Sequence, residues 1–306
     1  MRSAGTSSPT PGVFAELRRG INLAGVMDRR DDLPGWSVRA DDLAAIADAG
    51  FSTVRVPVRW WGRAADLLHS VDALLDLAWA RGLAVVLTLH HADAVCEDPR
   101  GSAAPLRALW RLIAAHFKGT GGLLAFELLN EPRPPMTPAD WNALLRVVLA
   151  GVREVDPDRP VIAGGAQAST LSGLRQLELP RDNHLIATLH YYEPFRFTHQ
   201  GAAWEPGSEH WLGTTWGTPA DHAAVTTDLE AGAAWASGRN VPLYVGEFGT
   251  LDRADHNSRA RWTRWVRREL DRLDVPWAYW DFATDFGAFD RDRRAWRRGL
   301  LEALMG

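Results

Sequence analysis

Apolar stretches suited to β-strands alternate eight times along the chain with stretches of helical periodicity. The predicted strands cover residues 20–25, 53–58, 84–91, 123–131, 161–167, 185–192, 243–247 and 277–282. Apolar residues that recur every three or four positions predict helices over 39–49, 71–81, 104–117, 138–155, 171–177, 219–237, 258–273 and 293–304. The alternation predicts an α/β fold, a (β/α)8 TIM barrel, in which helices cover a closed parallel sheet.

Local residue choices support this interpretation. The run 84–89, Ala-Val-Val-Leu-Thr-Leu, is apolar on both faces, as expected of a strand covered by helices on one side and by barrel interior on the other. Thr137 and Thr218 each precede Pro-Ala-Asp. A hydroxyl at the N-cap, a proline in the first turn and a nearby carboxylate are typical of a helix start.

Length and composition indicate one domain. A chain of 306 residues with 46% hydrophobic content can bury one large core, and barrels commonly use this length as a single unit. We expect a flexible tail over 1–12, rich in Ser, Thr, Pro and Gly, and a catalytic domain over 13–306. The tail lacks an apolar h-region, which predicts a cytoplasmic protein, with secretion open if a leader was removed. No apolar stretch is long enough to predict a membrane span.

Charge and cysteine content narrow the partners. The net charge is −4, and Lys118 is the only lysine, so positive charge comes from arginines scattered over the predicted helices. This distribution predicts no nucleic-acid-binding face. Cys96 is the only cysteine, which permits no internal disulfide and suits a reducing compartment. We expect a monomer that binds an oligosaccharide or polysaccharide substrate and needs no cofactor.

Two short motifs place a glutamate where a predicted strand ends. Glu131 lies in Leu-Asn-Glu-Pro at 129–132, and Glu247 lies in Gly-Glu-Phe-Gly at 246–249. Because the carboxyl ends of barrel strands meet on one rim, we expect both side chains to share that rim. Two facing carboxylic acids are what hydrolysis of a glycosidic bond requires.

Seven segments in order along the chain carry a family resemblance. They are 19–23 (Arg-Gly-Ile-Asn-Leu), 54–60 (Val-Arg-Val-Pro-Val-Arg-Trp), 89–91 (Leu-His-His), 129–132, 190–194 (His-Tyr-Tyr-Glu-Pro), 246–249 and 277–280 (Trp-Ala-Tyr-Trp). Together they resemble glycoside hydrolase family 5, the cellulase and β-mannanase family of clan A. From residue 190 onward the sequence is similar to bacterial endoglucanases of that family. The resemblance runs from the first predicted strand to the eighth.

The resemblance implies a retaining reaction in which Glu131 is the acid/base and Glu247 is the nucleophile. A lone glutamate at a strand end is most often solvated or ion-paired, but the Asn-Glu-Pro and Gly-Glu-Phe contexts favour catalysis. Glu127 is expected to be a buried structural partner of Arg55 instead.

The resemblance also implies a set of residues around the sugar. Arg55 and Tyr192 would keep the nucleophile ionised, and His190 would tune the acid/base. The complete predicted substrate-binding set is Asn22, Arg55, His90, His91, Asn130, His190, Tyr192, Trp211 and Trp280. For Trp60, Trp61, Trp204 and Trp216, sugar stacking and loop packing are equally open. No metal is predicted, because adjacent histidines on a strand point to opposite faces and no zinc motif accompanies them.

Departures from the family pattern leave the substrate open. Gly25 and Asp28 stand where related endoglucanases have asparagine and glutamate, so the catalytic core is kept while the sugar contacts change. The main hypothesis is a retaining hydrolase of β-linked, chiefly β-1,4, glucan or mannan oligosaccharides. The alternative is an intracellular, pathway-dedicated β-glycosidase or transglycosylase acting on a glycosylated small molecule. A lyase or isomerase barrel would need a phosphate-binding glycine loop, and a non-catalytic sugar-binding protein would not need both glutamates.

Overall fold

Eight parallel strands form a closed barrel in chain order in the computed structural model, which describes residues 16–28, 37–121 and 123–306. The strands are β1 (Arg19–Asn22), β2 (Thr53–Val58), β3 (Ala84–Leu89), β4 (Leu124–Glu127), β5 (Val161–Gly164), β6 (Leu185–Tyr191), β7 (Leu243–Phe248) and β8 (Trp277–Tyr279). Pairing of β8 with β1, with Gly20 opposite Ala278, closes the barrel. The predicted TIM barrel is confirmed, whereas the predicted tail 1–12 lies outside the described residues.

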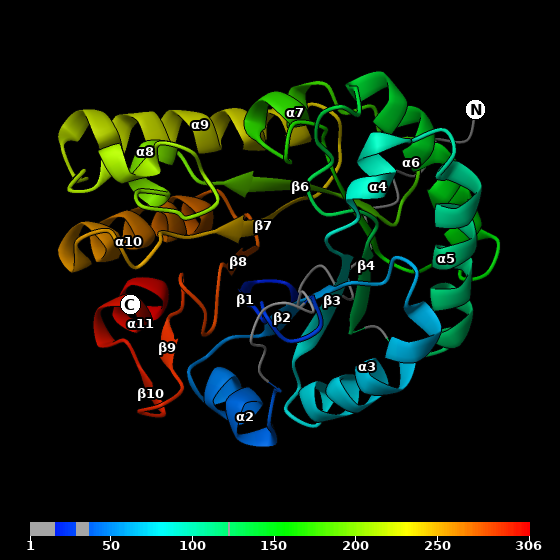
Figure 1. The fold of residues 1–306 in the computed structure, drawn as a ribbon, viewed down its shortest axis with the longest axis horizontal. Coiled ribbons are helices and arrows are strands. Elements are labelled where there is room, and N and C mark those ends of the chain that lie inside the picture. Colours follow the sequence, from blue (N-terminus) through cyan, green and yellow to red (C-terminus); the bar gives the residue numbers. More distant parts are fainter. Residues whose placement is uncertain (1–15, 29–36, 122) are drawn as a thin grey trace, which may run out of the picture.

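Helices surround the barrel (Figure 1). They are α2 (Ala40–Asp48), α3 (Ala64–Trp79), α4 (Asp93–Glu97), α5 (Ala103–His116), α6 (Pro138–Arg153), α7 (Leu171–Arg175), α8 (Phe195–Thr198), α9 (Pro219–Ser237), α10 (His256–Arg272) and α11 (Arg298–Met305), with a 3₁₀ turn, η1 (Ser208–Trp211). The hydroxyls of Thr137 and Thr218 accept backbone hydrogen bonds at the starts of α6 and α9, as predicted. Within the described ranges, no helix is long and apolar enough to cross a membrane.

The barrel interior is apolar below and polar above. Alternate strand residues, together with Leu17 beneath them, form a buried apolar cluster; its strand members are Val86, Ala125, Ile162, Ile186, Tyr244 and Ala278. A larger cluster joins the outer strand faces to the helices. Nearer the carboxyl ends of the strands, buried polar residues such as Arg55 and Glu127 replace the apolar ones. The buried apolar cluster therefore lies beneath a layer of buried polar residues, which forms the floor of the barrel's carboxyl-terminal end.

Several element boundaries differ from the predictions. Helix α3 begins at Ala64 rather than residue 71, because Ala64 joins Val71 and Leu75 on its buried face. The predicted helix 293–304 begins only at Arg298. Its first residues instead form β10 (Ala295–Trp296), which pairs with β9 (Phe289–Asp290). Strands β3, β4 and β5 end two to four residues early, and the residues beyond them form the loops of the rim.

Candidate active site

The two motif glutamates lie at the carboxyl-terminal rim of the barrel. Glu247 is the penultimate residue of β7, and Glu131 follows the end of β4 by four residues. Glu131 has a backbone φ of 45°, in the left-handed region that residues other than glycine rarely adopt. The acid in the first motif is therefore held by the loop after β4 rather than by the strand itself.

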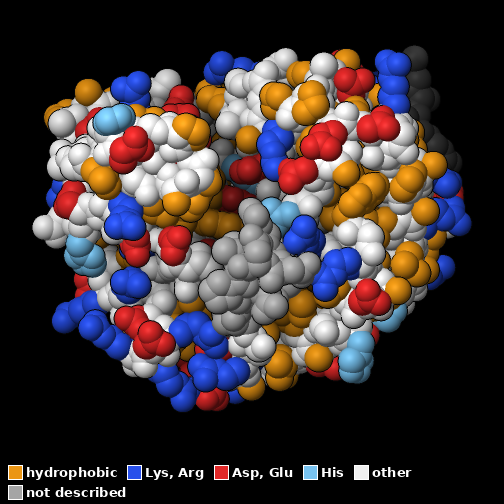
Figure 2. All heavy atoms as spheres, in the orientation of Figure 1, with side chains coloured by type: hydrophobic (Ala, Val, Ile, Leu, Met, Phe, Trp, Pro, Cys, Tyr) orange, Lys and Arg blue, Asp and Glu red, His pale blue; other side chains and the backbone are white. Residues whose placement is uncertain are grey.

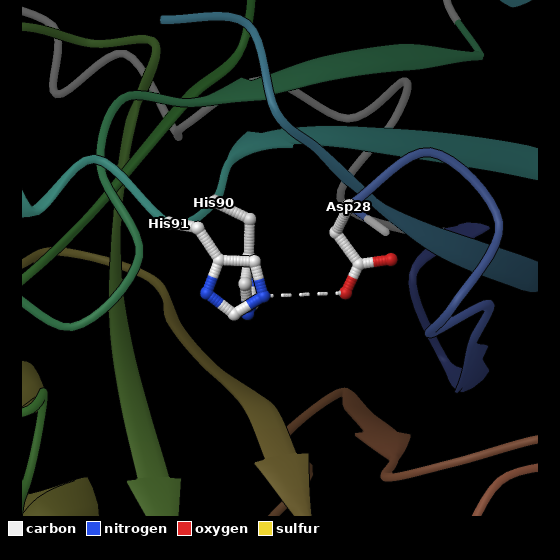
Figure 3. A group of neighbouring side chains, drawn as sticks. All are labelled: Asp28, His90 and His91. Carbon is white, nitrogen blue, oxygen red and sulfur yellow. Dashed lines mark ion pairs between the residues drawn. The ribbon is translucent and has the colours of Figure 1, made fainter. Parts of the chain in front are cut away.

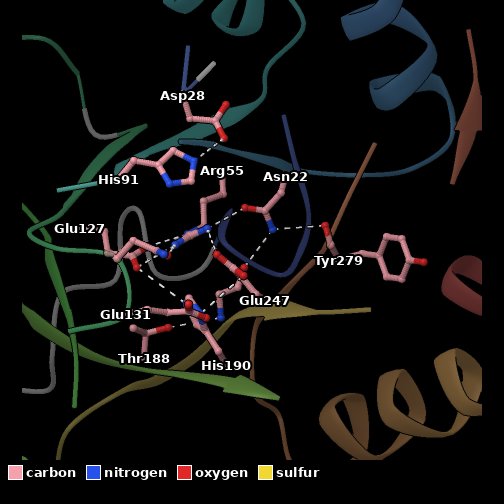
Figure 4. Close-up of polar contacts among 12 residues, drawn as sticks. Asn22, Asp28, Arg55, His91, Glu127, Glu131, Thr188, His190, Glu247 and Tyr279 are labelled. Atoms are coloured by element: carbon pink, nitrogen blue, oxygen red, sulfur yellow. Dashed lines mark hydrogen bonds and ion pairs between the residues drawn. The ribbon is translucent and has the colours of Figure 1, made fainter. Parts of the chain in front are cut away.

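Arg55, in β2, uses all five of its N–H donors in the buried floor of the site (Figure 4). Two go to Glu127, from Nε to Oε2 at 2.6 Å and from Nη2 to Oε1 at 2.9 Å. The others reach Oδ1 of Asn22 at 2.8 Å, Oε1 of Glu247 at 2.7 Å and Oδ1 of Asn130 at 2.8 Å. Burial lowers the pKa of Arg55, but the two carboxylates outweigh it and raise this pKa, so the guanidinium stays charged. The predicted pairing of Glu127 with Arg55 is confirmed.

Glu247 accepts a hydrogen bond on each carboxylate oxygen. Arg55 donates to Oε1, and the hydroxyl of Tyr192 donates to Oε2 at 2.8 Å. Burial and the charge of Glu247 raise the pKa of Tyr192 well above its ordinary value, so the hydroxyl keeps the proton that it donates. These contacts fix the orientation of the Glu247 carboxylate.

His190, in β6, connects the two glutamates. Its Nδ1 lies 2.9 Å from Oε1 of Glu131 and 3.6 Å from Oε2 of Glu247. Burial lowers the pKa of His190, but the two carboxylates outweigh it and raise this pKa above 6.5. For Glu131, burial raises the pKa, yet the hydrogen bond with His190 and nearby cations lower it overall. Both shifts favour a protonated His190 ring facing an ionised Glu131 carboxylate.

The two carboxylates are close to each other. One oxygen of Glu131, one of Glu247 and a ring nitrogen of His190 lie within 4.8 Å of one another. Burial raises the pKa of Glu247 above 4.5 and the charge of Glu131 adds to the rise, while His190, Arg55 and Tyr192 oppose it. The three groups could surround a cation, but each already has a hydrogen-bonding partner in the described structure.

Asn22 and Asn130 both accept from Arg55, but only Asn130 reaches the cleft. Asn22 is fully buried, and its amide nitrogen donates to the carbonyls of Gly246 at 3.0 Å and Tyr279 at 3.2 Å. Asn22 therefore ties β1 to β7 and β8 and orients Arg55. The structure places it beneath the cleft rather than at the predicted sugar-binding surface.

A cleft opens above the polar floor. Figure 2 shows a hollow near the centre of this face, with acidic side chains at its floor. The lining residues are His90, His91, Asn130, Glu131, Tyr192, His199, Trp204, Glu247, Trp280, Thr284, Asp285 and Phe286. The cleft thus brings together most of the predicted site residues, while Arg55, His190 and Asn22 lie buried below them.

A larger hollow lies at the opposite end of the barrel, between segments 177–185 and 239–242. Its acidic residues Glu178 and Asp182 are ion-paired with Arg146 and Arg153. Its size alone would favour this hollow as an active site, but both of these acids already form ion pairs with arginines. The cleft around the two glutamates is the better candidate active site.

The two adjacent histidines do not point to opposite faces, contrary to the sequence prediction. Strand β3 ends at Leu89, and His91 has a backbone φ of 54°, so the alternation of strand side chains stops before this pair. Both histidines line the cleft. The His90 ring lies nearly parallel to Trp280, at 10° and 5.6 Å between centroids, and burial lowers the pKa of His90 well below 6.5.

The loop after β1 brings Asp28 to the same end of the cleft. Oδ1 of Asp28 accepts from the backbone N–H of Gly25 at 2.7 Å, and Oδ2 lies 3.7 Å from Nε2 of His91. Asp281, after β8, is fully buried, and burial raises its pKa to about 7. Asp28 is therefore turned toward a histidine that lines the cleft.

The tryptophans of the long loop after β6 lie in different places. Trp211 is not among the lining residues of the described cleft; it packs edge-on against Phe195, 6.1 Å between ring centroids. Trp204 lines the cleft instead, 58% exposed and beside Phe286. Its signal was only its place in the long loop after β6, which it shared with Trp211. His199 and the segment 284–286 had no sequence signal as cleft residues.

The barrel and its facing glutamates define an enzyme of the glycoside hydrolase class. The sequence model of the cellulase family, glycosyl hydrolase family 5, matches residues 19–285. The chain belongs to this family.

Named relatives agree with this assignment. Endoglucanase H of Acetivibrio thermocellus is 29% identical over 309 aligned residues, which cover 94% of this chain but 33% of that protein. The chain thus spans about a third of that relative's length. Endoglucanase C of the same organism is 26% identical, with 95% of this chain and 98% of that protein covered.

Solved structures extend the comparison to bound sugars. Cel5A of Thermotoga maritima in complex with mannotriose has a TM-score of 0.92 and 37% identity, with 95% of this chain and 99% of that chain covered. Another structure of that enzyme holds cellobiose, with the same TM-score and identity.

Proposed function

We propose that this protein is a retaining β-glycosidase that cleaves β-1,4-linked glucan or mannan oligosaccharides, with Glu247 as nucleophile and Glu131 as acid/base. The observation that carries the proposal is the approach of the two carboxylates to within 4.8 Å across one cleft. Retaining enzymes hold their carboxyl groups about 5–5.5 Å apart, whereas inverting enzymes leave about 6.5–9.5 Å for a water molecule.

In the first step, the Glu247 carboxylate attacks the anomeric carbon and forms a glycosyl ester. Glu131 donates its proton to the glycosidic oxygen, and the bond from that oxygen to the anomeric carbon breaks. In the second step, Glu131 takes a proton from water, the water oxygen attacks the anomeric carbon, and Glu247 is released. Arg55 and Tyr192 orient Glu247 and disperse its charge through their hydrogen bonds.

The proton for the first step is supplied by the pair of His190 and Glu131. Their Nδ1–Oε1 distance of 2.9 Å allows the proton to pass from the ring to the carboxylate as the leaving oxygen develops charge. His190 is a positioning residue in this scheme, because Glu131 is the group that faces the cleft.

The substrate class follows from the comparisons and from the cleft. Relatives are named endoglucanases, and Cel5A has been captured with both mannotriose and cellobiose. Trp280 and Trp204 line the cleft and offer flat apolar faces for sugar rings. Asn130 has its Oδ1 occupied by Arg55, which leaves its amide nitrogen for a sugar hydroxyl.

The test is a panel of aryl β-glucosides and β-mannosides together with cello- and manno-oligosaccharides, read by product length. We expect cleavage of β-1,4 oligosaccharides that disappears in Glu247→Ala. Glu131→Ala should keep activity on aryl glycosides, whose leaving groups need no proton, and lose it on oligosaccharides. Full activity of Glu131→Ala on oligosaccharides, or no cleavage of any panel member by the wild type, would contradict the proposal.

A further inference from the structure

Three potential metal ligands converge at one end of the cleft. Asp28, His90 and His91 each contribute one ligand atom, and these atoms all lie within 4.8 Å of one another. Figure 3 shows the Asp28 carboxylate pointing at the His91 ring, with the His90 ring directly behind it. The group lies outside the pair of glutamates that performs the proposed reaction.

The distance between His91 and Asp28 is compatible with a shared tetrahedral ion. Bonds of about 2.0–2.2 Å place neighbouring ligand atoms of a tetrahedral zinc ion roughly 3.4 Å apart. Nε2 of His91 and Oδ2 of Asp28 are 3.7 Å apart, longer than a hydrogen bond and close to that spacing. The His91 side chain is 39% exposed, so it has room for the small movement that coordination needs.

An orphaned polar atom supports a missing ligand. His90 is buried, and its Nδ1 has no hydrogen-bond partner in the described structure. A buried polar atom without a partner is costly, and its presence calls for an explanation such as an ion. The His90 ring is held against Trp280, which keeps it facing this end of the cleft.

We propose that Asp28, His90 and His91 bind a divalent transition-metal ion of the zinc class. Two imidazoles and one carboxylate are ligands that such ions accept, and three protein ligands leave a fourth position open. That position faces the cleft, since both histidines line it. The ion and a sugar ring therefore compete for the same space. The competition, though not the metal site itself, rests on the proposed function.

The experiment is isothermal titration calorimetry of the tag-free protein with Zn²⁺ alone. We expect one site per chain in the wild type, and a Kd at least about tenfold weaker in Asp28→Asn and in His91→Gln, because each removes a ligand. Mg²⁺ should not bind, because it prefers oxygen ligands. Asp28→Asn can disturb the contact with Gly25, so His91→Gln, at a more exposed side chain, keeps the test decisive.

A matched control is His116→Asn. His116 Nε2 also contacts a carboxylate, Asp72 Oδ1 at 2.8 Å, but on the outer surface between α5 and α3. The proposal expects unchanged Zn²⁺ affinity in this control and weaker affinity when cellobiose is added to the wild type. Equal Zn²⁺ affinity in wild type and His91→Gln would overturn the metal site. If the wild-type protein binds Zn²⁺ but cleaves no oligosaccharide, the proposed function is overturned and the metal site stands.

Discussion

The two ends of the cleft are built differently. At the end that holds the two glutamates, Arg55 donates to five acceptor atoms, and each oxygen of Glu247 has its own donor. At the end that holds the two adjacent histidines, Asp28 lies 3.7 Å from His91, and Nδ1 of His90 has no partner among the described residues. The first network is closed and buried, whereas the second leaves polar atoms available to a ligand.

This contrast suggests that the residues that support the reaction differ from those that select the ligand. Changing one member of a closed buried network leaves its partners unsatisfied, so substitutions there are costly. The other end makes fewer such contacts, so we expect substitutions there to cost the fold less. We therefore expect the chemistry of this enzyme to be that of its family and its choice of ligand to be its own.

The largest effect should come from Glu247→Ala. Removing the nucleophile should lower kcat by at least about a thousandfold, because the glycosyl ester can no longer form. Azide should restore part of the turnover by entering the vacated space and yield a glycosyl azide of inverted configuration. Kinetics with an aryl glycoside and NMR of the azide product measure both. An azide product of retained configuration would place the nucleophile elsewhere.

The next effect concerns Glu127, which holds Arg55 in the buried network beneath the two glutamates. Glu127→Gln should lower kcat by about ten- to a hundredfold, since a charge-assisted hydrogen bond contributes about 1.5–3 kcal/mol. KM should change little, because Glu127 is fully buried beneath the cleft. Steady-state kinetics and a thermal melt separate this effect from unfolding.

A matched control for this variant is Asp182→Asn. Asp182 makes a similar two-point contact with Arg153, at 2.6 and 3.0 Å, far from the cleft. It should lose thermal stability while kcat stays at the wild-type value. If both variants lose kcat equally, the role of Glu127 is only structural.

A smaller effect is expected at the open end. Gly25 has a φ of 79°, a conformation that asparagine tolerates better than most residues, so Gly25→Asn with Asp28→Glu is compatible with the loop. The two larger polar side chains should raise kcat/KM on cellotetraose by roughly tenfold, the contribution of about one good hydrogen bond to a sugar hydroxyl. Short aryl glycosides should be nearly unaffected. No gain on cellotetraose would show that other residues hold the sugar.

The last prediction concerns the pH dependence of kcat/KM in the wild-type protein. Activity needs an ionised Glu247, whose pKa is raised by burial, so kcat/KM should fall as pH drops through a value above 4.5. It also needs the proton held by His190 and Glu131, so it should fall again above the raised pKa of His190, beyond pH 6.5. Profiles of kcat/KM measure both limbs, with His116→Asn as a control. An alkaline limb below pH 6.5 would exclude His190 from proton supply.

Sequence patterns were sufficient for the barrel and for two glutamates at strand ends. The pairing of Glu127 with Arg55 was expected and is confirmed, whereas the roles of Arg55 and Tyr192 beside Glu247 were implied only by the family resemblance. The opposite-face prediction for His90 and His91 was wrong because it extended strand alternation past Leu89, into a left-handed residue that composition does not reveal.

Loop packing explains the other differences. Trp211 and Trp204 share one loop, and only the tertiary contacts with Phe195 and Phe286 decide which of them lines the cleft. Trp296 packs against Phe51, 5.5 Å between ring centroids, and lies in β10 despite its helical surroundings in sequence. Such contacts join distant segments, so short-range patterns do not predict them.

The stereochemistry of the first product tests the central claim most directly. Proton NMR of a cello-oligosaccharide digest, recorded before the new reducing end mutarotates, identifies the anomer that the enzyme releases. Attack by Glu247 followed by water inverts the anomeric carbon twice, so the account predicts the β-anomer first. Initial release of the α-anomer would contradict a covalent intermediate on Glu247 and the assignment of both glutamates.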